Sequence, residues 1–171
     1  MVHFLSFSGA FLVHLPLKLS NVGYKKMISE DIIAELRGLN EEVPGPSSLP
    51  TDDEIDQVEQ QLGVSLHPDF RQYLRTLSDV AFSVFEPVTI TCPESCTHLP
   101  SVADSAWSDW GVPRSLVPIC EDNADFYCVS EDGKVIFWAH DTQSPTGEEW
   151  SSVGDWIKQV LIKEGKEIQE S

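Results

Sequence analysis

Basic residues are scarce in this sequence: 11 lysines and arginines stand against 28 aspartates and glutamates, which gives a formal net charge of −17. All of the carboxylates follow residue 26. A surface of this sign repels phosphate backbones and anionic lipid by the same Coulomb force that attracts basic proteins. We therefore expect no nucleic-acid partner and no membrane partner. Solubility alone would account for the same composition.

Motifs for nucleotide binding and catalysis are also missing. The sequence has no Gly-x-x-x-x-Gly-Lys or Gly-x-Gly-x-x-Gly loop to hold phosphate, and no Gly-x-Ser-x-Gly nucleophile motif. His140 and Asp141 could serve as a base and its orienting carboxylate, with Ser144 or Cys128 as nucleophile. The alternative is that His140 and Asp141 close a strand into a turn. We predict a non-enzymatic protein that needs no cofactor.

Cysteine is too infrequent to replace a hydrophobic core with disulfides. The four cysteines stand at positions 92, 96, 120 and 128, and this usage favours reduced thiols and a cytoplasmic location. Cys92, Cys96 and His98 could form half of a zinc site completed by Cys120 or Cys128. The spacing lacks a Cys-x-x-Cys pair, so we expect free thiols and no metal.

The first 26 residues differ from the rest of the chain. Their apolar run over residues 4–17 has no lysine or arginine before it, is interrupted by His14 and Pro16, and is shorter than the ~20 residues that span a bilayer. We predict that residues 1–26 are a poorly ordered N-terminal extension, with an export signal as the alternative. Residues 27–171 have the length of a single domain.

Helical signals dominate the first half of this domain. Ser29 and the spacing of the apolar residues predict a helix over 29–40, and a proline-rich linker follows over 41–50. Thr51 and Glu54 form a capping box that begins a second helix. Gly63 suits the end of that helix, and Pro68 suits the first turn of the next one.

Strand signals dominate the second half. Alternating apolar residues predict an edge or bulged strand over 84–90, and short apolar runs predict strands over 116–119, 126–129 and 135–138. The Asp-Gly pair at 132–133 predicts a tight hairpin. Residues 91–114 read as a loop with a short helix over 102–107. Ser151 or Ser152 caps a C-terminal helix whose apolar face includes Trp156.

The order of these elements resembles the SUKH superfamily of Smi/Knr-type proteins. The resemblance covers about residues 29–163 and rests on Leu49-Pro-Thr through Tyr73-Leu74, Leu116-Val-Pro-Ile119, Asp125-Phe-Tyr-Cys-Val129, Gly133-Lys-Val-Ile-Phe-Trp-Ala-His-Asp141 and a tryptophan-bearing C-terminal helix. Many relatives have a glycine-rich turn after the Val-Pro-Ile strand. Here residues 120–125 contain no glycine, so we expect Asn123 to supply the left-handed conformation.

The resemblance implies an α+β domain over 27–171, in which a mixed or largely antiparallel sheet is flanked by the N-terminal helices and a C-terminal helix. It also implies protein binding: bacterial members resemble immunity proteins that neutralise a cognate toxin, often a nuclease. Fungal members resemble regulators or scaffolds in cell-wall and signalling networks, which gives the alternative function.

A binding surface is predicted from exposed aromatic and acidic residues. Two tryptophans lie in a polar, loop-like segment, and one group of carboxylates lies beside them while another lies in a strand connection. The predicted contacts are Trp107, Asp109, Trp110, Glu121, Asp122 and Asp125. We expect the acidic loops to steer a basic toxin domain into place and the aromatic residues to anchor it.

Overall fold

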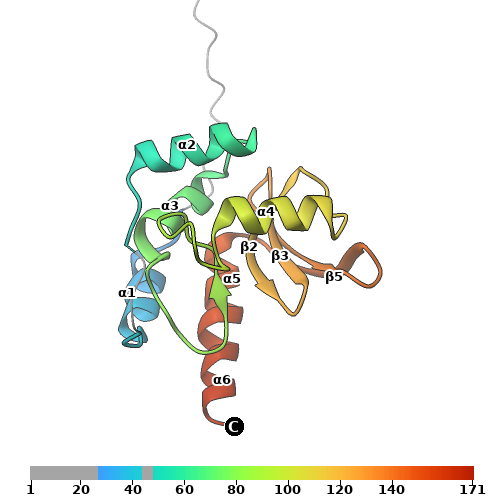
Figure 1. The fold of residues 1–171 in the computed structure, drawn as a ribbon. Helices are drawn as coiled ribbons and strands as arrows, with labels where there is room; N and C mark the ends of the chain where they lie inside the picture. Colours follow the sequence, from blue (N-terminus) through green and yellow to red (C-terminus); the bar gives the residue numbers. More distant parts are fainter. Residues whose placement is uncertain (1–26, 44–47) are drawn as a thin grey trace, which may run out of the picture.

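The computed structural model describes residues 27–43 and 48–171 (Figure 1). The extension predicted for residues 1–26 lies outside them. The elements run in the order α1 (Glu30–Gly38), α2 (Asp52–Leu62), α3 (Pro68–Leu77), β1 (Glu86–Pro87), α4 (Leu99–Ser108), β2 (Leu116–Asp122), β3 (Asp125–Ser130), β4 (Val135–Ala139), β5 (Ser144–Trp150), α5 (Val153–Trp156), the π-helical segment η1 (Ile157–Glu164) and α6 (Gly165–Gln169).

The strands form one five-stranded sheet in the order β1-β2-β3-β4-β5, and every neighbouring pair is antiparallel. The α+β class predicted from the sequence is therefore confirmed. Because each strand pairs with the next one along the chain, short turns suffice for the connections from β2 to β5.

The start and stop signals of the N-terminal helices are confirmed. Thr51 Oγ1 accepts a hydrogen bond from the Glu54 amide at 3.3 Å, and the Thr51 amide donates to Glu54 Oε2 at 2.8 Å. Gly63 ends α2 with φ of 68°, and Pro68 is the first residue of α3. Ser29 holds the N-cap position of α1, although its side chain makes no capping hydrogen bond.

Three elements differ from the sequence-based expectation. The strand expected over 84–90 shortens to the two residues of β1, and the short helix expected over 102–107 lengthens to α4, with Pro100 in its first turn. Strand β5 was not expected at all, because its sequence Ser-Pro-Thr-Gly-Glu-Glu-Trp lacks apolar alternation and its middle is exposed. Pairing with β4 holds it in the sheet as an edge strand, where proline and charge are tolerated.

The two faces of the sheet are covered by different helices. Helix α4 crosses one face and contacts β2, whereas the C-terminal helical segment lies on the other face, where α5 contacts both β5 and α3 (Figure 1). Strand register places Cys120, Tyr127 and Phe137 on the face of the C-terminal helix, because Cys120 pairs with Tyr127 and Tyr127 pairs with Phe137.

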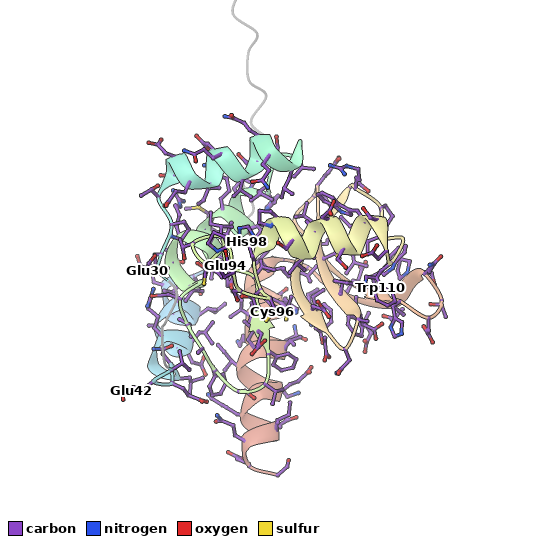
Figure 2. All side chains as sticks on the ribbon, viewed as in Figure 1. Glu30, Glu42, Glu94, Cys96, His98 and Trp110 are labelled. Atoms are coloured by element: carbon purple, nitrogen blue, oxygen red, sulfur yellow. The ribbon has the colours of Figure 1, made fainter. Side chains whose placement is uncertain are left out.

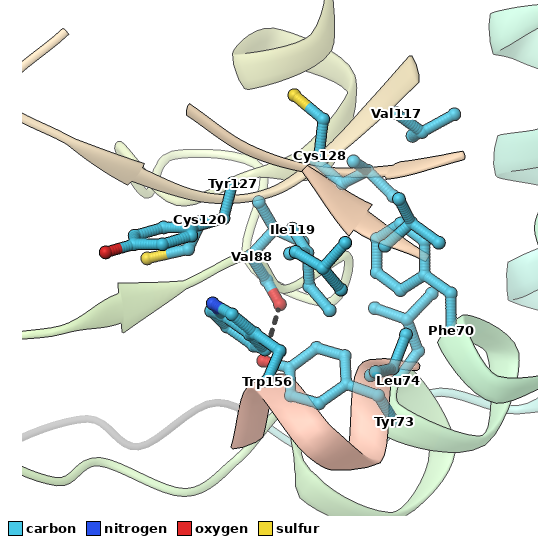
Figure 3. Packing of buried hydrophobic residues seen from close by; sticks show 14 of the residues in the cluster. Phe70, Tyr73, Leu74, Val88, Val117, Ile119, Cys120, Tyr127, Cys128 and Trp156 are labelled. Carbon is cyan, nitrogen blue, oxygen red and sulfur yellow. Dashed lines mark hydrogen bonds between the residues drawn. The ribbon is translucent and has the colours of Figure 1, made fainter. Parts of the chain in front are cut away.

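The core on that face centres on aromatic residues. Trp156 is completely buried, and Tyr73 donates its hydroxyl hydrogen to the Val88 carbonyl oxygen at 3.1 Å (Figure 3). The predicted apolar face of the C-terminal helix is buried throughout: Val153, Trp156, Ile157, Val160 and Leu161. This burial fixes the helix against the sheet and sets the position of the strand ends beside it.

Candidate partner-binding surface

The β2–β3 turn brings together the acidic residues predicted to bind a partner. Asn123 adopts φ of 53° and Ala124 adopts φ of 72°. The left-handed conformation expected of Asn123 is therefore present, and Ala124 shares it without being a residue type that favours it. This turn places Asp122 opposite Asp125 across the β2–β3 pair.

Asp125 and Trp110 meet at His140. Asp125 Oδ1 accepts a hydrogen bond from the His140 amide at 2.8 Å and lies 2.7 Å from His140 Nδ1. The Trp110 ring meets the His140 ring edge-on, with centroids 5.4 Å apart. The Trp110 carbonyl oxygen accepts a hydrogen bond from Trp138 Nε1 at 3.3 Å. His140 thus joins the end of α4 to the end of the sheet.

Trp107 lies apart from His140, and its polar contacts are made within the domain. Its indole N–H donates to the Leu116 carbonyl oxygen at 2.9 Å, and the Arg114 guanidinium stands 4.2 Å from the centre of a Trp107 ring. Arg114 also donates to the Leu62 carbonyl oxygen at 2.6 Å. Leu116 and Asp122 are the two ends of β2, so the structure separates Trp107 from the β2–β3 turn.

Trp110, unlike Trp107, has an exposed acidic neighbour. Trp110 lies just beyond α4, at the opposite end from His98, and is half-buried (Figure 2). Asp109 beside it is exposed and accepts a hydrogen bond from Ser105 Oγ at 3.1 Å. Trp110 and Asp109 therefore remain available on the surface near the β2–β3 turn.

Glu121 and Asp122 point to opposite faces of the sheet, as successive strand residues must. Glu121 pairs with Glu86 across β1 and β2, which places two carboxylates side by side without a cation between them. Asp122 lies on the same face as Cys120 and Tyr127. The end of the sheet is consequently acidic on both faces.

Two further carboxylates, Glu148 and Glu164, complete this region. Burial raises the pKa of Tyr127, and the charges of Asp122, Glu164 and Glu148 raise it further. Glu164 is exposed, but partial desolvation still raises its pKa, with Glu148, Glu167 and Asp122 adding to the effect and Lys163 opposing it. Asp122, Glu148 and Glu164 therefore lie within electrostatic reach of Tyr127. We call Glu86, Glu121, Asp122, Glu148 and Glu164 the acidic sheet end.

Counter-charges are missing from the acidic sheet end. Within residues 27–43 and 48–171, none of its five carboxylates forms an ion pair. Sequence reasoning missed Glu148 because β5 was not expected. It missed Glu164 because this residue is not on the predicted apolar face of the C-terminal helix. Only the strand pairing and the helix docking bring them beside Asp122.

The four cysteines do not form one cluster in the described structure. Cys120 and Cys128 lie on opposite faces of the sheet, because Cys120 pairs with Tyr127, the neighbour of Cys128. Cys92 is half-buried and Cys96 is exposed. In the described part of the chain, no group of three or more histidine, cysteine, aspartate or glutamate side chains could hold a metal ion. The geometry gives no support to the zinc site considered from the sequence.

The catalytic arrangement considered from the sequence is also unsupported. The carboxylate that meets His140 is Asp125, while Asp141 is exposed. Burial raises the pKa of the Cys128 thiol far above its ordinary value, so this thiol stays protonated and unreactive at neutral pH. Ser144 donates its hydroxyl hydrogen to Thr142 at 3.0 Å. His140 therefore acts as a structural link in this geometry.

A cleft of about 610 Å³ lies between the α2–α3 connection, the start of β2 and the β3–β4 turn. His67 lines it and packs against Gly133, where an added Cβ would lie 2.5 Å from His67 Cε1. Gly133 has φ of 84°, as the predicted hairpin requires. Arg114 also lines the cleft, but its guanidinium is engaged with Leu62 and Trp107.

The five-stranded antiparallel sheet, its flanking helices and the acidic sheet end define a single α+β domain. A model of the SUKH_5 family, described as SMI1-KNR4 cell-wall, matches residues 29–162, and the chain belongs to this family. A comparison with curated proteins gave no match.

A solved structure supports the assignment. The chain is similar to a protein from Pseudomonas syringae pv. tomato whose crystal structure is known, with 44% sequence identity and a TM-score of 0.75. The match covers 79% of this chain and 99% of that one. The family resemblance read from the sequence is thereby confirmed. Among the helices of the described residues, none is long and apolar enough to cross a membrane.

Proposed function

We propose that the protein is a non-enzymatic immunity protein that neutralises a cognate toxin by direct binding in the cytoplasm. The observation that carries this proposal is the acidic sheet end, where five carboxylates lack ion-pair partners within the described residues. Unpaired charge of one sign raises the folding cost of a domain, so its retention favours a role in binding. A nuclease toxin offers the complementary basic surface.

The predicted contacts take two roles in this proposal. Glu121 and Asp122 steer a basic toxin domain toward the sheet end, and Trp110 with Asp109 contacts it beside the β2–β3 turn. Asp125 positions Trp110 through His140. Trp107 stabilises the start of β2 instead, because its indole hydrogen bond and its contact with Arg114 are internal.

The second candidate is a regulatory or scaffold protein of the Smi/Knr type. The description of the matching family, SMI1-KNR4 cell-wall, favours it. An acidic surface would serve such a protein as well, by attracting several basic partners of lower affinity. The two functions differ in the number and kind of proteins bound.

Affinity capture from the native host separates them. The tagged full-length chain is incubated with lysate from cells that express the neighbouring genes, and bound proteins are identified by mass spectrometry. We expect one stoichiometric partner with the sequence of a toxin domain, whose expression stops growth unless this protein is co-expressed. Capture of several unrelated cell-wall or signalling proteins, with no rescue of growth, would support the scaffold function and overturn the immunity function.

A further inference from the structure

The hydroxyl group of Tyr127 makes no hydrogen bond to another described residue, and it remains accessible to solvent although the residue as a whole is only 6% exposed. Figure 3 shows its hydroxyl beside the Cys120 thiol, on the side of the ring away from Phe70 and Leu74. The other buried tyrosine of this core, Tyr73, donates to Val88 instead. This oxygen reaches solvent at the edge of an otherwise buried ring, so it is open to a donor from water or from a bound partner.

Aromatic side chains surround that hydroxyl-bearing ring. The Phe137 ring stacks on Tyr127 with centroids 4.5 Å apart, and the Trp150 ring meets it edge-on at 5.5 Å. Phe137 and Trp150 are half-buried, so part of each remains on the surface. The faces of such rings carry negative electrostatic potential, which attracts cations.

Carboxylates lie around the same ring. Asp122, Glu148 and Glu164 act on Tyr127 electrostatically, and Glu148 and Glu164 are exposed. None of the three forms an ion pair within the described chain. Lys134 pairs with Glu149 and Lys166 with Glu35, while Lys163, next to Glu164 in sequence, acts on that carboxylate electrostatically without forming an ion pair with it. Aromatic faces, an unpartnered hydroxyl oxygen and unpaired carboxylates thus occupy one place.

We infer that this Tyr127 surface, formed by Asp122, Tyr127, Phe137, Glu148, Trp150 and Glu164, binds an arginine side chain presented by a protein partner. A guanidinium group stacks on aromatic rings and donates several hydrogen bonds in one plane, so it can satisfy the Tyr127 oxygen and two carboxylates together. A lysine ammonium is a point charge that is more strongly hydrated, and we expect it to bind less tightly. The inference rests on the proposed function, since the arginine would belong to the basic toxin.

The test uses short peptides and needs no knowledge of the partner. The ¹⁵N-labelled full-length chain is titrated with acetyl-Gly-Arg-Gly-amide, and the Trp150 indole signal is followed by NMR. Peptides with lysine and with citrulline, the neutral isostere of arginine, replace it in parallel. We expect saturable shifts for the arginine peptide, weaker binding for lysine and no saturation for citrulline. Equal binding of the arginine and citrulline peptides would overturn the inference.

Charge-matched variants locate the binding. The triple variant Asp122→Asn/Glu148→Gln/Glu164→Gln should weaken the arginine peptide at least tenfold. The control variant Asp53→Asn/Glu94→Gln/Glu131→Gln removes the same charge from exposed positions, and it should keep most of the affinity. Equal loss in both triple variants would mean that net charge alone attracts the peptide.

A third variant tests the contribution of the Tyr127 hydroxyl group. Tyr127→Phe keeps the ring but removes the hydroxyl oxygen, and we expect the arginine peptide to bind about two- to tenfold more weakly. Unchanged affinity would overturn the role of the hydroxyl group.

The two proposals fail in distinguishable ways. Peptide binding without any toxin partner would reject the immunity function alone. A captured toxin that binds the Asp122→Asn/Glu148→Gln/Glu164→Gln variant as tightly as the unmodified protein would reject the arginine site alone.

Discussion

The surface formed by α2 and α3 and the acidic sheet end both carry clustered carboxylates, and they differ in where the counter-charges lie. On α2, Asp56 and Glu59 face Arg71 of α3 at 2.7 and 2.5 Å, and Asp52 faces Arg75 at 3.0 Å. At the acidic sheet end no described cation takes such a position. Acidic residues of one chain are thus paired with cations in the first region and unpaired in the second.

The α2–α3 pairs also complete backbone hydrogen bonding. Glu59 Oε1 accepts a hydrogen bond from the Leu66 amide at 2.6 Å, while its other oxygen pairs with Arg71. One carboxylate therefore joins α2, the connection to α3 and α3 itself. At the sheet end, Glu86 accepts a weak hydrogen bond from Cys96 Sγ at 3.8 Å and Asp122 accepts one from the adjacent Asn123 Nδ2 at 2.8 Å, but neither carboxylate is paired with a described cation.

The largest expected effect concerns association with the captured toxin. At low salt, we expect the Asp122→Asn/Glu148→Gln/Glu164→Gln variant to associate about tenfold more slowly, because steering depends on charge near the contact. Stopped-flow rates at several salt concentrations measure this effect. The control Asp53→Asn/Glu94→Gln/Glu131→Gln should keep both the rate and its salt dependence, and an equal slowing of both variants would mean that net charge, and not the acidic sheet end, sets the rate.

Removing a cation from the α2–α3 surface should leave carboxylates there unpaired, as they are at the acidic sheet end. Arg71→Met leaves Asp56 and Glu59 without their partner, and we expect a loss of about 1–3 kcal/mol in the free energy of unfolding, measured with urea. Lys134→Met breaks an exposed pair with Glu149 and should cost clearly less than Arg71→Met, because solvent screens both charges. Similar losses in the two variants would show that the Arg71 pairs are no more structural than an ordinary surface pair.

The two buried tyrosines extend the comparison to hydroxyl groups. Tyr73→Phe deprives the Val88 carbonyl oxygen of its donor and should lower the free energy of unfolding by about 1–2 kcal/mol. Tyr127→Phe removes a hydroxyl that has no described partner, so stability should change by less than about 0.5 kcal/mol. Thermal or urea unfolding of both variants measures the difference. A large loss for Tyr127→Phe would reveal a structural hydrogen bond for its hydroxyl.

The smallest effects concern pH, and they have opposite signs in the two regions. The backbone and hydroxyl hydrogen bonds of Thr51 lower the pKa of Glu54, so the stability that ionised Glu54 contributes is lost as pH falls through its folded pKa. Burial and neighbouring carboxylates raise the pKa of Glu164, so its ionised form opposes folding, and stability returns as pH falls through its folded pKa.

Single amide variants separate these two contributions. At pH 7, Glu164→Gln should stabilise the protein by less than about 0.5 kcal/mol, and the gain should shrink toward pH 4.5. Glu54→Gln should destabilise it at pH 7, with a deficit that shrinks at more acidic pH. Urea unfolding between pH 7 and pH 4 measures both trends, and trends of equal sign would contradict the assignment.

Local signals in the sequence were sufficient for the helices. The Thr51 capping box, Gly63 and Pro68 act within a few residues of their own positions, so no tertiary contact was needed to place α2 and α3. The hairpin at Gly133 and the left-handed Asn123 were predictable for the same reason. Strand β5 was not, because Ser144, Pro145 and Gly147 carry no strand preference and only pairing with β4 orders them.

The candidate surface was half predictable. Trp110, Glu121 and Asp122 were named from the sequence, and the structure places all three at one end of the sheet or beside it. Trp107 was paired with Trp110 because they are three residues apart, yet one turns toward Leu116 and the other toward His140. Tyr127, Glu148 and Glu164 could not have been joined to Asp122 from their spacing.

The sequence by itself determined the family, the α+β class and the excess of negative charge, because composition and short-range motifs are properties of the chain. Only the tertiary structure decided which carboxylates meet a cation. Ion pairing depends on side chains from distant segments reaching within about 4 Å of each other, and that distance is set by the docking of α3 on α2 and of the C-terminal helix on the sheet.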